Sequence, residues 1–216
     1  MSHSPPPDRT AFRRPEWQLI SRCRTPRQTQ QFLRAIPYNA EANGPTLRTF
    51  RGVVEHGCAH CFEAALTAAV ILEQHGYPPL LLDLTSADKL DHVVFLFERN
   101  GRFGTVGKSR FPGLLGRKPV FPSVQALVED YIEPFVDYTG RIISYAVFDL
   151  RTVHGINWRL SERNLWALER ILIARRHIRV ATCNRRHRQY VERYRAYKRR
   201  YPGREPAYFA NKQRWL

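Results

Sequence analysis

The longest apolar stretch of the chain follows Cys61 and contains neither glycine nor proline. From Phe62 to Gln74 the sequence reads FEAALTAAVILEQ, which is rich in alanine and leucine. A helix built from this stretch is apolar on nearly every face, and such helices lie inside a core. Gly76 then supplies a helix stop. The pattern therefore predicts a buried helix from Cys61 to about Gln74.

Short apolar runs after this helix predict a sheet. Residues 80–84 (LLLDL) and 92–98 (HVVFLFE) are rich in residues that favour strands. The second run leads into Asn100-Gly101 and then into RFGTVG. An Asn-Gly pair between two such runs indicates a hairpin, because both turn positions accept positive φ. Residues 142–150 (IISYAVFDL) predict a last strand.

The remaining segments are expected to form helices and loops. Residues 47–54 alternate weakly and predict a strand or a loop, and residues 108–122 predict a loop that crosses the surface. Helices are expected at 27–36, at 124–138 after an N-cap at Ser123, at 161–177 after an N-cap at Ser161, and at 185–200. Together these elements indicate an α+β fold.

Composition and charge divide the chain into three parts. Hydrophobic residues make up 43% of the 216 residues, enough for a core, but the serines and prolines near the N-terminus predict a disordered leader over 1–15. Residues 16–150 are expected to form the core domain. Residues 1–150 hold 17 basic and 15 acidic residues, whereas residues 151–216 hold 18 basic and 4 acidic ones, a net charge of +14. The last third is therefore expected to be a basic helical extension that contacts nucleic acid, an anionic membrane surface or another polyanion.

The expected C-terminal helix carries four tyrosines on one face and many basic residues around them. The tyrosines recur at steps of four, three and four residues, at Tyr190, Tyr194, Tyr197 and Tyr201. One interpretation packs the tyrosines on the body with the charges in water; the other stacks them on bases while the charges neutralise phosphates. The candidate polyanion contacts are Arg185, Arg186, Arg188, Arg193, Arg195, Lys198, Arg199 and Arg200.

Nothing in the sequence indicates export or a membrane span. No segment resembles a signal-peptide core, and none approaches the roughly 18 uncharged residues of a membrane helix. Four cysteines in a chain of this length do not make a disulfide scaffold, and free thiols fit a reducing compartment. The sequence therefore predicts a cytoplasmic protein without a transmembrane segment.

Cys61 and His92 are the candidate catalytic pair. A cysteine in the first turn of a buried helix lies where the helix dipole and free backbone N–H groups favour the thiolate. His92 opens a strand and is expected to take the thiol proton. The pattern indicates a cysteine enzyme that needs no cofactor and acts on a protein, peptide or amide substrate.

The segment from about residue 50 to 110 resembles the transglutaminase-like, papain-related cysteine enzymes. In that family a cysteine begins a helix that ends in a Leu-Gly-Ile-Pro-like turn, and a histidine then begins a strand followed by a hairpin. Here Gly76-Tyr77-Pro78 matches the turn, and His92 opens HVVFLFERNGRF. The resemblance implies a Cys61-bearing helix packed on an antiparallel sheet, and acyl transfer through a thioester, as in an amidase, a protease or a transglutaminase.

The third residue of the family's site, usually aspartate, has no counterpart at the expected place. It would fall near Gly107, where the sequence reads Gly-Lys-Ser, so Ser109 is the candidate to orient His92 through its hydroxyl. Asp83 ends the preceding strand and could face the same cleft. Asp91 adjoins His92, but neighbours on a strand point to opposite faces.

Other interpretations of these residues stay open. Cys61 can be a small buried hydrophobe of an inactive scaffold that binds a polyanion through its basic C-terminal region. Cys58 and Cys61 form a Cys-x-x-Cys pair, which suits a redox dithiol, or half of a zinc site completed by Cys183 and His187. A metal is not expected, because structural zinc requires four convergent ligands and the second pair lies in the basic tail.

Overall fold

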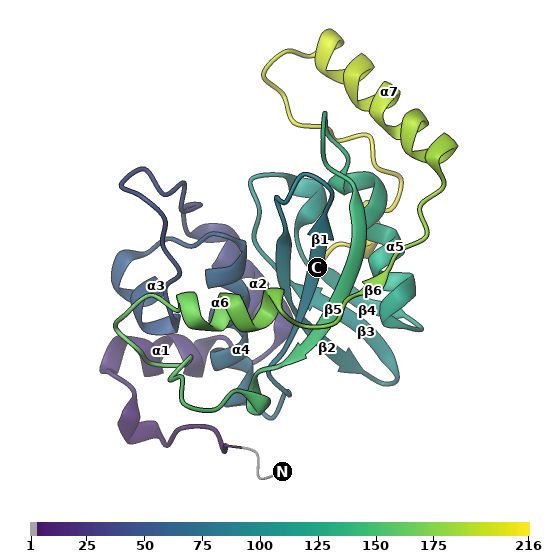
Figure 1. Cartoon of the computed structure of the whole chain (residues 1–216). Coiled ribbons are helices and arrows are strands. Elements are labelled where there is room, and N and C mark those ends of the chain that lie inside the picture. Colours follow the sequence, from purple (N-terminus) through teal and green to yellow (C-terminus); the bar gives the residue numbers. More distant parts are fainter. Residues whose placement is uncertain (1–3) are drawn as a thin grey trace.

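The computed structural model describes residues 4–216 and confirms the α+β class, with helices on both faces of one antiparallel sheet (Figure 1). The strand order is β4-β3-β2-β1-β5-β6. The strands are β1 (Leu80–Ser86), β2 (His92–Arg99), β3 (Arg102–Val106), β4 (Arg117–Phe121), β5 (Ile142–Asp149) and β6 (Ile178–Arg179). The predicted hairpin is confirmed, since β2 pairs with β3 and both Asn100 and Gly101 have positive φ, at 51° and 69°.

Seven α-helices surround this sheet in the described part of the chain. They are α1 (Arg14–Arg22), α2 (Pro26–Ala35), α3 (Phe50–His56), α4 (Cys61–Glu73), α5 (Val124–Phe135), α6 (Trp166–Ile173) and α7 (Asn184–Arg200). Short 3-10 turns lie at Arg9–Ala11, Pro112–Leu114, Leu150–Thr152 and Lys212–Arg214. None of the helices formed by residues 4–216 has the length and apolar character needed to cross a bilayer.

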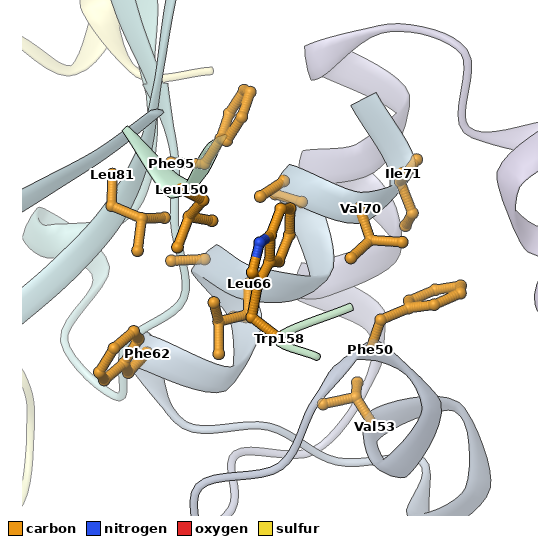
Figure 2. Close-up of a cluster of buried hydrophobic side chains, with 14 of the residues drawn as sticks. Phe50, Val53, Phe62, Leu66, Val70, Ile71, Leu81, Phe95, Leu150 and Trp158 are labelled. Atoms are coloured by element: carbon orange, nitrogen blue, oxygen red, sulfur yellow. The ribbon is translucent and has the colours of Figure 1, made fainter. Parts of the chain in front are cut away.

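The first core is built around α4, the buried helix that the apolar run predicts. Its side chains from Ala64 to Leu72 are fully buried. Leu66 packs among residues of the sheet and of α3, while Trp158 reaches it from the C-terminal third (Figure 2). Because neighbours surround α4 on all sides, even its polar residues Glu63, Thr67 and Glu73 are buried and need partners within the protein.

The second core lies on the opposite face of the sheet, under α5. Strand residues alternate between the two cores: Leu81 and Phe95 belong to the first, whereas Leu82 and Leu96 belong to the second. Both faces of the central strands are therefore buried, which explains why these strands read as continuous apolar runs rather than as alternating ones.

Two expectations for local structure were wrong. Residues 47–54 contain the start of helix α3, whose buried Phe50 and Val53 are spaced for one helix face. The expected loop at 108–122 contains β4, where Arg117 and Phe121 point inward. Arg117 is completely buried and pairs with Asp130, so a charge stands where the pattern needs an apolar residue.

The expected boundaries also shift. Phe12 is buried and stacks edge-on against Phe50, and α1 begins at Arg14, so order begins inside the predicted leader of 1–15; residues 1–3 lie outside the described residues. The helix expected at 161–177 is the shorter α6, because the Ser161 hydroxyl accepts from the Arg163 N–H in a local turn instead of capping it.

The basic last third is partly built into the body. Leu168 and Leu172 of α6 join the first core, and β6 pairs with β5. Helix α7 then stands away from the N-terminal helices (Figure 1). The chain finally returns to the sheet, where Trp215 forms an antiparallel β-bridge with Arg117 of β4. Next to it, the Leu216 N–H donates to the Gly116 carbonyl.

We expect Leu66→Ala to lower the free energy of unfolding by about 2–5 kcal/mol, because it opens a cavity at the centre of the first core. Urea unfolding followed by circular dichroism measures this loss. Val147→Ala, at a half-exposed position of β5, is the matched control and should cost well under half as much. Equal losses in the two variants would contradict the central place of α4.

Candidate functional site

Cys61 and His92 lie together on a cleft of about 530 Å³. Cys61 is the first residue of α4 and is partly exposed, unlike the helix that follows it. His92 is the first residue of β2 and pairs with Leu84 of β1. The start of α4 and the start of β2 thus meet at one end of the sheet, where His92 lies close enough to the Cys61 thiol to favour its thiolate.

The second ring nitrogen of His92 is held by the backbone. His92 Nε2 lies 2.9 Å from the carbonyl oxygen of Leu114, and the ring is buried. A carbonyl only accepts, so Nε2 carries a proton and Nδ1 is left for the Cys61 thiol. In this site a backbone carbonyl does what a carboxylate does in a Ser-His-Asp triad: it fixes the tautomer and orientation of the imidazole.

Arg117 fixes the loop that carries this carbonyl. Its guanidinium donates to the carbonyl of Leu115 at 2.7 Å and to that of Gly113 at 2.8 Å, on either side of Leu114. The same group pairs with Asp130 at 2.7 Å and lies over the ring of Tyr131 at 4.1 Å. The buried arginine thus positions the Leu114 carbonyl against His92.

Glu63 organises the other side of the cysteine. This completely buried carboxylate accepts four hydrogen bonds at the start of α4. Burial opposes its charged form, but the charge of His60 and these hydrogen bonds outweigh burial and lower its pKa. The donors are the backbone N–H groups of His60 and Arg48, the Asn39 amide and the Thr46 hydroxyl, at 2.8–3.1 Å. Glu63 therefore ties the loop before α3 to the helix end that bears Cys61.

His60 is a second histidine beside the thiol. Its Nε2 lies 2.9 Å from the Thr46 carbonyl oxygen and 3.7 Å from a Glu63 carboxylate oxygen. Its Nδ1 lies 3.2 Å from the Phe62 backbone nitrogen and also within reach of Cys61. A neutral ring would accept from Phe62, whereas a charged ring donates to the thiolate. Glu63 on one side and a thiolate on the other both favour the charged ring.

The two histidines lower the pKa of Cys61. Burial alone would raise it, but the hydrogen bonds and charges of His60 and His92 outweigh burial and bring the pKa to about 5. Burial likewise opposes the charged form of His60, yet Cys61 and Glu63 raise its pKa to about 9. Near neutral pH Cys61 is therefore a thiolate beside the His60 imidazolium, and the thiolate is the reactive form of a cysteine.

The other candidates for the third residue do not contact His92. Ser109 lines the cleft, but its hydroxyl accepts from the Phe111 N–H at 3.0 Å, and the Leu114 carbonyl takes the position expected for it. Asp91 accepts from the Ser86 N–H at 2.8 Å and holds the connection between β1 and β2. Asp83 faces the cleft and contacts His177 at 3.0 Å.

The alternatives for the Cys-x-x-Cys pair find little support in the geometry. Cys58 accepts from the Arg48 guanidinium at 3.3 Å, and all four cysteines are free. Cys183 and His187 line a different cavity, between α5, β6 and α7. Across residues 4–216, no three His, Cys, Asp or Glu side chains are arranged to hold a metal ion.

Helix α7 presents its charges to solvent and part of its tyrosine face to the protein. Tyr194 is buried against Tyr138, and Tyr197 packs against Tyr201 and Tyr208. Of the candidate polyanion contacts, Arg193 pairs with Glu133 and Lys198 with Glu205. The other six are exposed: Arg185, Arg186, Arg188, Arg195, Arg199 and Arg200.

Sequence reasoning missed the residues that support the pair. Glu63 has a detectable signal, because it is one of only two charges in the apolar run and stands three residues after His60, the spacing of a capping box. Arg117 lies in a segment expected to be a loop. The role of the Leu114 carbonyl leaves no signal in the sequence, because every residue has a backbone carbonyl.

The rate of Cys61 alkylation should rise with pH around an apparent pKa of about 5. In His92→Ala, and also in His60→Ala, this value should move toward the usual thiol value of about 8.5, because each change removes a stabiliser of the thiolate. Iodoacetamide labelling across pH, read at Cys61 by tandem mass spectrometry, measures the apparent pKa in the wild type and in each variant. The exposed His56 supplies the control, and His56→Ala should leave the profile unchanged; a wild-type value near 8.5 would contradict the ion pair.

No protein-family model matches the chain, and no curated protein matches it at a significant level.

Proposed function

We propose that the protein is a cysteine-dependent acyl-transfer enzyme that acts on an amide or peptide through a thioester. The observation that carries this proposal is the contact of Cys61, at the first turn of a buried helix, with His92, whose other nitrogen is held by the Leu114 carbonyl. A nucleophile, a base and a group that orients the base are the elements of nucleophilic catalysis. They lie on a cleft large enough for a small substrate or a peptide segment.

In the first half-reaction the Cys61 thiolate attacks the carbonyl carbon of the amide. The C–O π electrons move to oxygen, and the resulting oxyanion is stabilised by the N-terminus of α4, where the Cys61 N–H is the candidate donor. His92 Nδ1 holds the proton released by the Cys61 thiol, and as the C–N bond breaks it donates this proton to the leaving amine. The products are a thioester on Cys61 and a free amine.

In the second half-reaction an acceptor cleaves the thioester. His92, now neutral, takes a proton from water as the water attacks, and the carboxylic acid leaves as the Cys61 sulfur departs. With water as the acceptor, the overall reaction is that of an amidase or a protease. An amine as acceptor gives transfer of the acyl group instead, which is the reaction of a transglutaminase.

We further propose that the chain has a transglutaminase-like core. The order of a cysteine-bearing helix, a histidine-bearing strand and a hairpin supports this, as does the packing of α4 on an antiparallel sheet. The departure lies at the third residue. The position near Gly107 holds no acid; instead the Gly107 backbone exchanges two hydrogen bonds with the Gln30 amide. The Leu114 carbonyl supplies the missing orientation.

Cys61→Ala should abolish hydrolysis, and His92→Ala should lower kcat by about 10²–10⁴-fold, the usual contribution of a general acid–base group. A panel of fluorogenic coumarin amides that differ in one amino-acid residue is the first assay, and acyl-enzyme mass spectrometry detects the thioester. Cys58→Ala removes the neighbouring thiol and should keep activity. Hydrolysis that survives in Cys61→Ala would refute the mechanism.

A second candidate function, binding of a polyanion, is favoured by one observation. Seven arginines of α7 are exposed, and they extend along a helix that stands away from the N-terminal helices (Figure 1). Clustered basic charge of this kind is the footprint expected for contact with phosphates. This function is compatible with catalysis in the cleft, because the two surfaces use different residues.

If α7 binds nucleic acid, affinity should fall steeply with salt, by nearly one power of the salt concentration for each phosphate contact. Replacing Arg185, Arg186 and Arg188 with glutamine should reduce the slope of log K against log salt by about 2–3. Fluorescence anisotropy with a labelled DNA duplex measures the slope. The matched control replaces three exposed arginines elsewhere, Arg24, Arg99 and Arg102, and an equal loss there would show that only net charge matters.

A further inference from the structure

The cleft beside Cys61 is acidic in a strongly basic chain. The chain has a net charge of +16, with 35 Lys or Arg against 19 Asp or Glu. Among the described residues that line the cleft, seven are Asp or Glu and only two, Lys89 and Arg110, are Lys or Arg. The charge balance of the cleft is therefore the reverse of that of the molecule.

Some of these carboxylates serve their own loops. Asp88 accepts from the Leu90 N–H, Asp91 from the Ser86 N–H, and Asp137 from the N–H groups of two residues that follow it. These backbone contacts account for the presence of three of the seven acids, so those three do not indicate a ligand. The acids that indicate a ligand are those with a buried oxygen that has no hydrogen-bond partner.

Asp83 is the main such acid. Its side chain is 4% exposed, and its Oδ1 atom has no hydrogen-bond partner in the described structure. Its other oxygen, Oδ2, lies 3.0 Å from His177 Nε2. His177 Nδ1 donates to the Arg175 carbonyl, so the contact between His177 and Asp83 must itself hold a further proton. Wherever that proton resides between Oδ2 and Nε2, Oδ1 remains an acceptor.

Glu205, which also lines the cleft, has a second unsatisfied oxygen. Its Oε1 atom accepts from Lys198 at 3.2 Å, whereas its Oε2 atom is buried without a partner. A buried acceptor without a donor destabilises the folded protein, and more so when it is charged. Two such oxygens, in a cleft with five further acids, call for a ligand that brings both donors and positive charge.

We propose, on the basis of the acyl-transfer function proposed above, that the cleft selects an acyl substrate that carries an ammonium or guanidinium group, with Asp83 as the main specificity residue. The lysine or arginine side chain of a peptide and a small amide with a charged amine share this chemistry. Asp83 and Cys61 line the same cleft, so a cationic group held at Asp83 lies on the cleft that carries the reacting thiol.

The test compares three methanethiosulfonates that transfer groups of different charge to a thiol: a trimethylammonioethyl, a neutral methyl and a sulfonatoethyl group. Rates at Cys61 are read by tandem mass spectrometry and divided by the rates with 2-mercaptoethanol. We expect the cationic reagent to react with Cys61 at least about tenfold faster than the anionic one, as expected for an acidic cleft. Cys183, exposed among α7 arginines, is the internal reference and should prefer the anionic reagent.

Asp83→Asn keeps the shape of the side chain and should reduce the cationic preference at Cys61 by about threefold or more. Glu98→Gln removes one negative charge from an exposed site outside the cleft and should leave the preference unchanged. If Asp83→Asn fails to fold, Glu169→Gln and Glu205→Gln test the same cleft from its other walls. Rates of hydrolysis of the coumarin amides of lysine and arginine are then compared with that of the 6-aminohexanoyl coumarin amide. This comparison distinguishes a peptide side chain from a small amine.

The outcomes separate the two proposals. Fast reaction of Cys61 with all three reagents, without preference for the cation, would overturn the selectivity and leave the acyl-transfer function intact. Slow reaction with all three, no faster than an ordinary thiol at the same pH, would overturn the nucleophile and with it the selectivity. A cationic preference that survives both Asp83→Asn and the two glutamine variants would refute the assignment to these residues.

Discussion

The candidate site depends on one buried carboxylate. Glu63 lies at the end of an apolar helix, fully removed from water, and burial of an unpaired carboxylate costs far more than a domain of this size can spare. Four donors satisfy it, and three of them come from the loop before α3. The charge is stable only when that segment lies against the helix end. The loop, His60 and Cys61 are therefore held in one geometry by a single group.

The base is held by an independent set of contacts from a different part of the chain. His92 begins a strand that is buried on both faces, and its partner carbonyl belongs to a loop clamped by Arg117. The thiol is thus fixed by the N-terminal helices and the imidazole by the sheet and the loop before β4. The cleft lies where these two rigid parts meet, and the last third of the chain adds residues such as Glu205 to its wall.

Sequence patterns revealed the elements whose physics is local. The α4 run and the Asn-Gly hairpin were predicted correctly, because helix burial and turn chemistry leave marks on neighbouring residues. The positions of Cys61 and His92 at the starts of these elements followed directly. What could not be predicted depends on contacts between distant segments. The strand β4 was hidden by a buried arginine whose partner, Asp130, lies on another element, and the carbonyl that orients His92 is indistinguishable in sequence from any other.

The return of the chain to β4 has a consequence for how the molecule behaves beside other copies of itself. A sheet ends in strands with unpaired backbone groups, and long open edges invite pairing between molecules. Here Trp215 bridges Arg117 on the outer strand β4, and the opposite edge, β6, is only two residues long. One end of the sheet is covered by the chain itself and the other is too short to template a partner strand. The fold thereby guards a strongly apolar sheet against edge-to-edge aggregation.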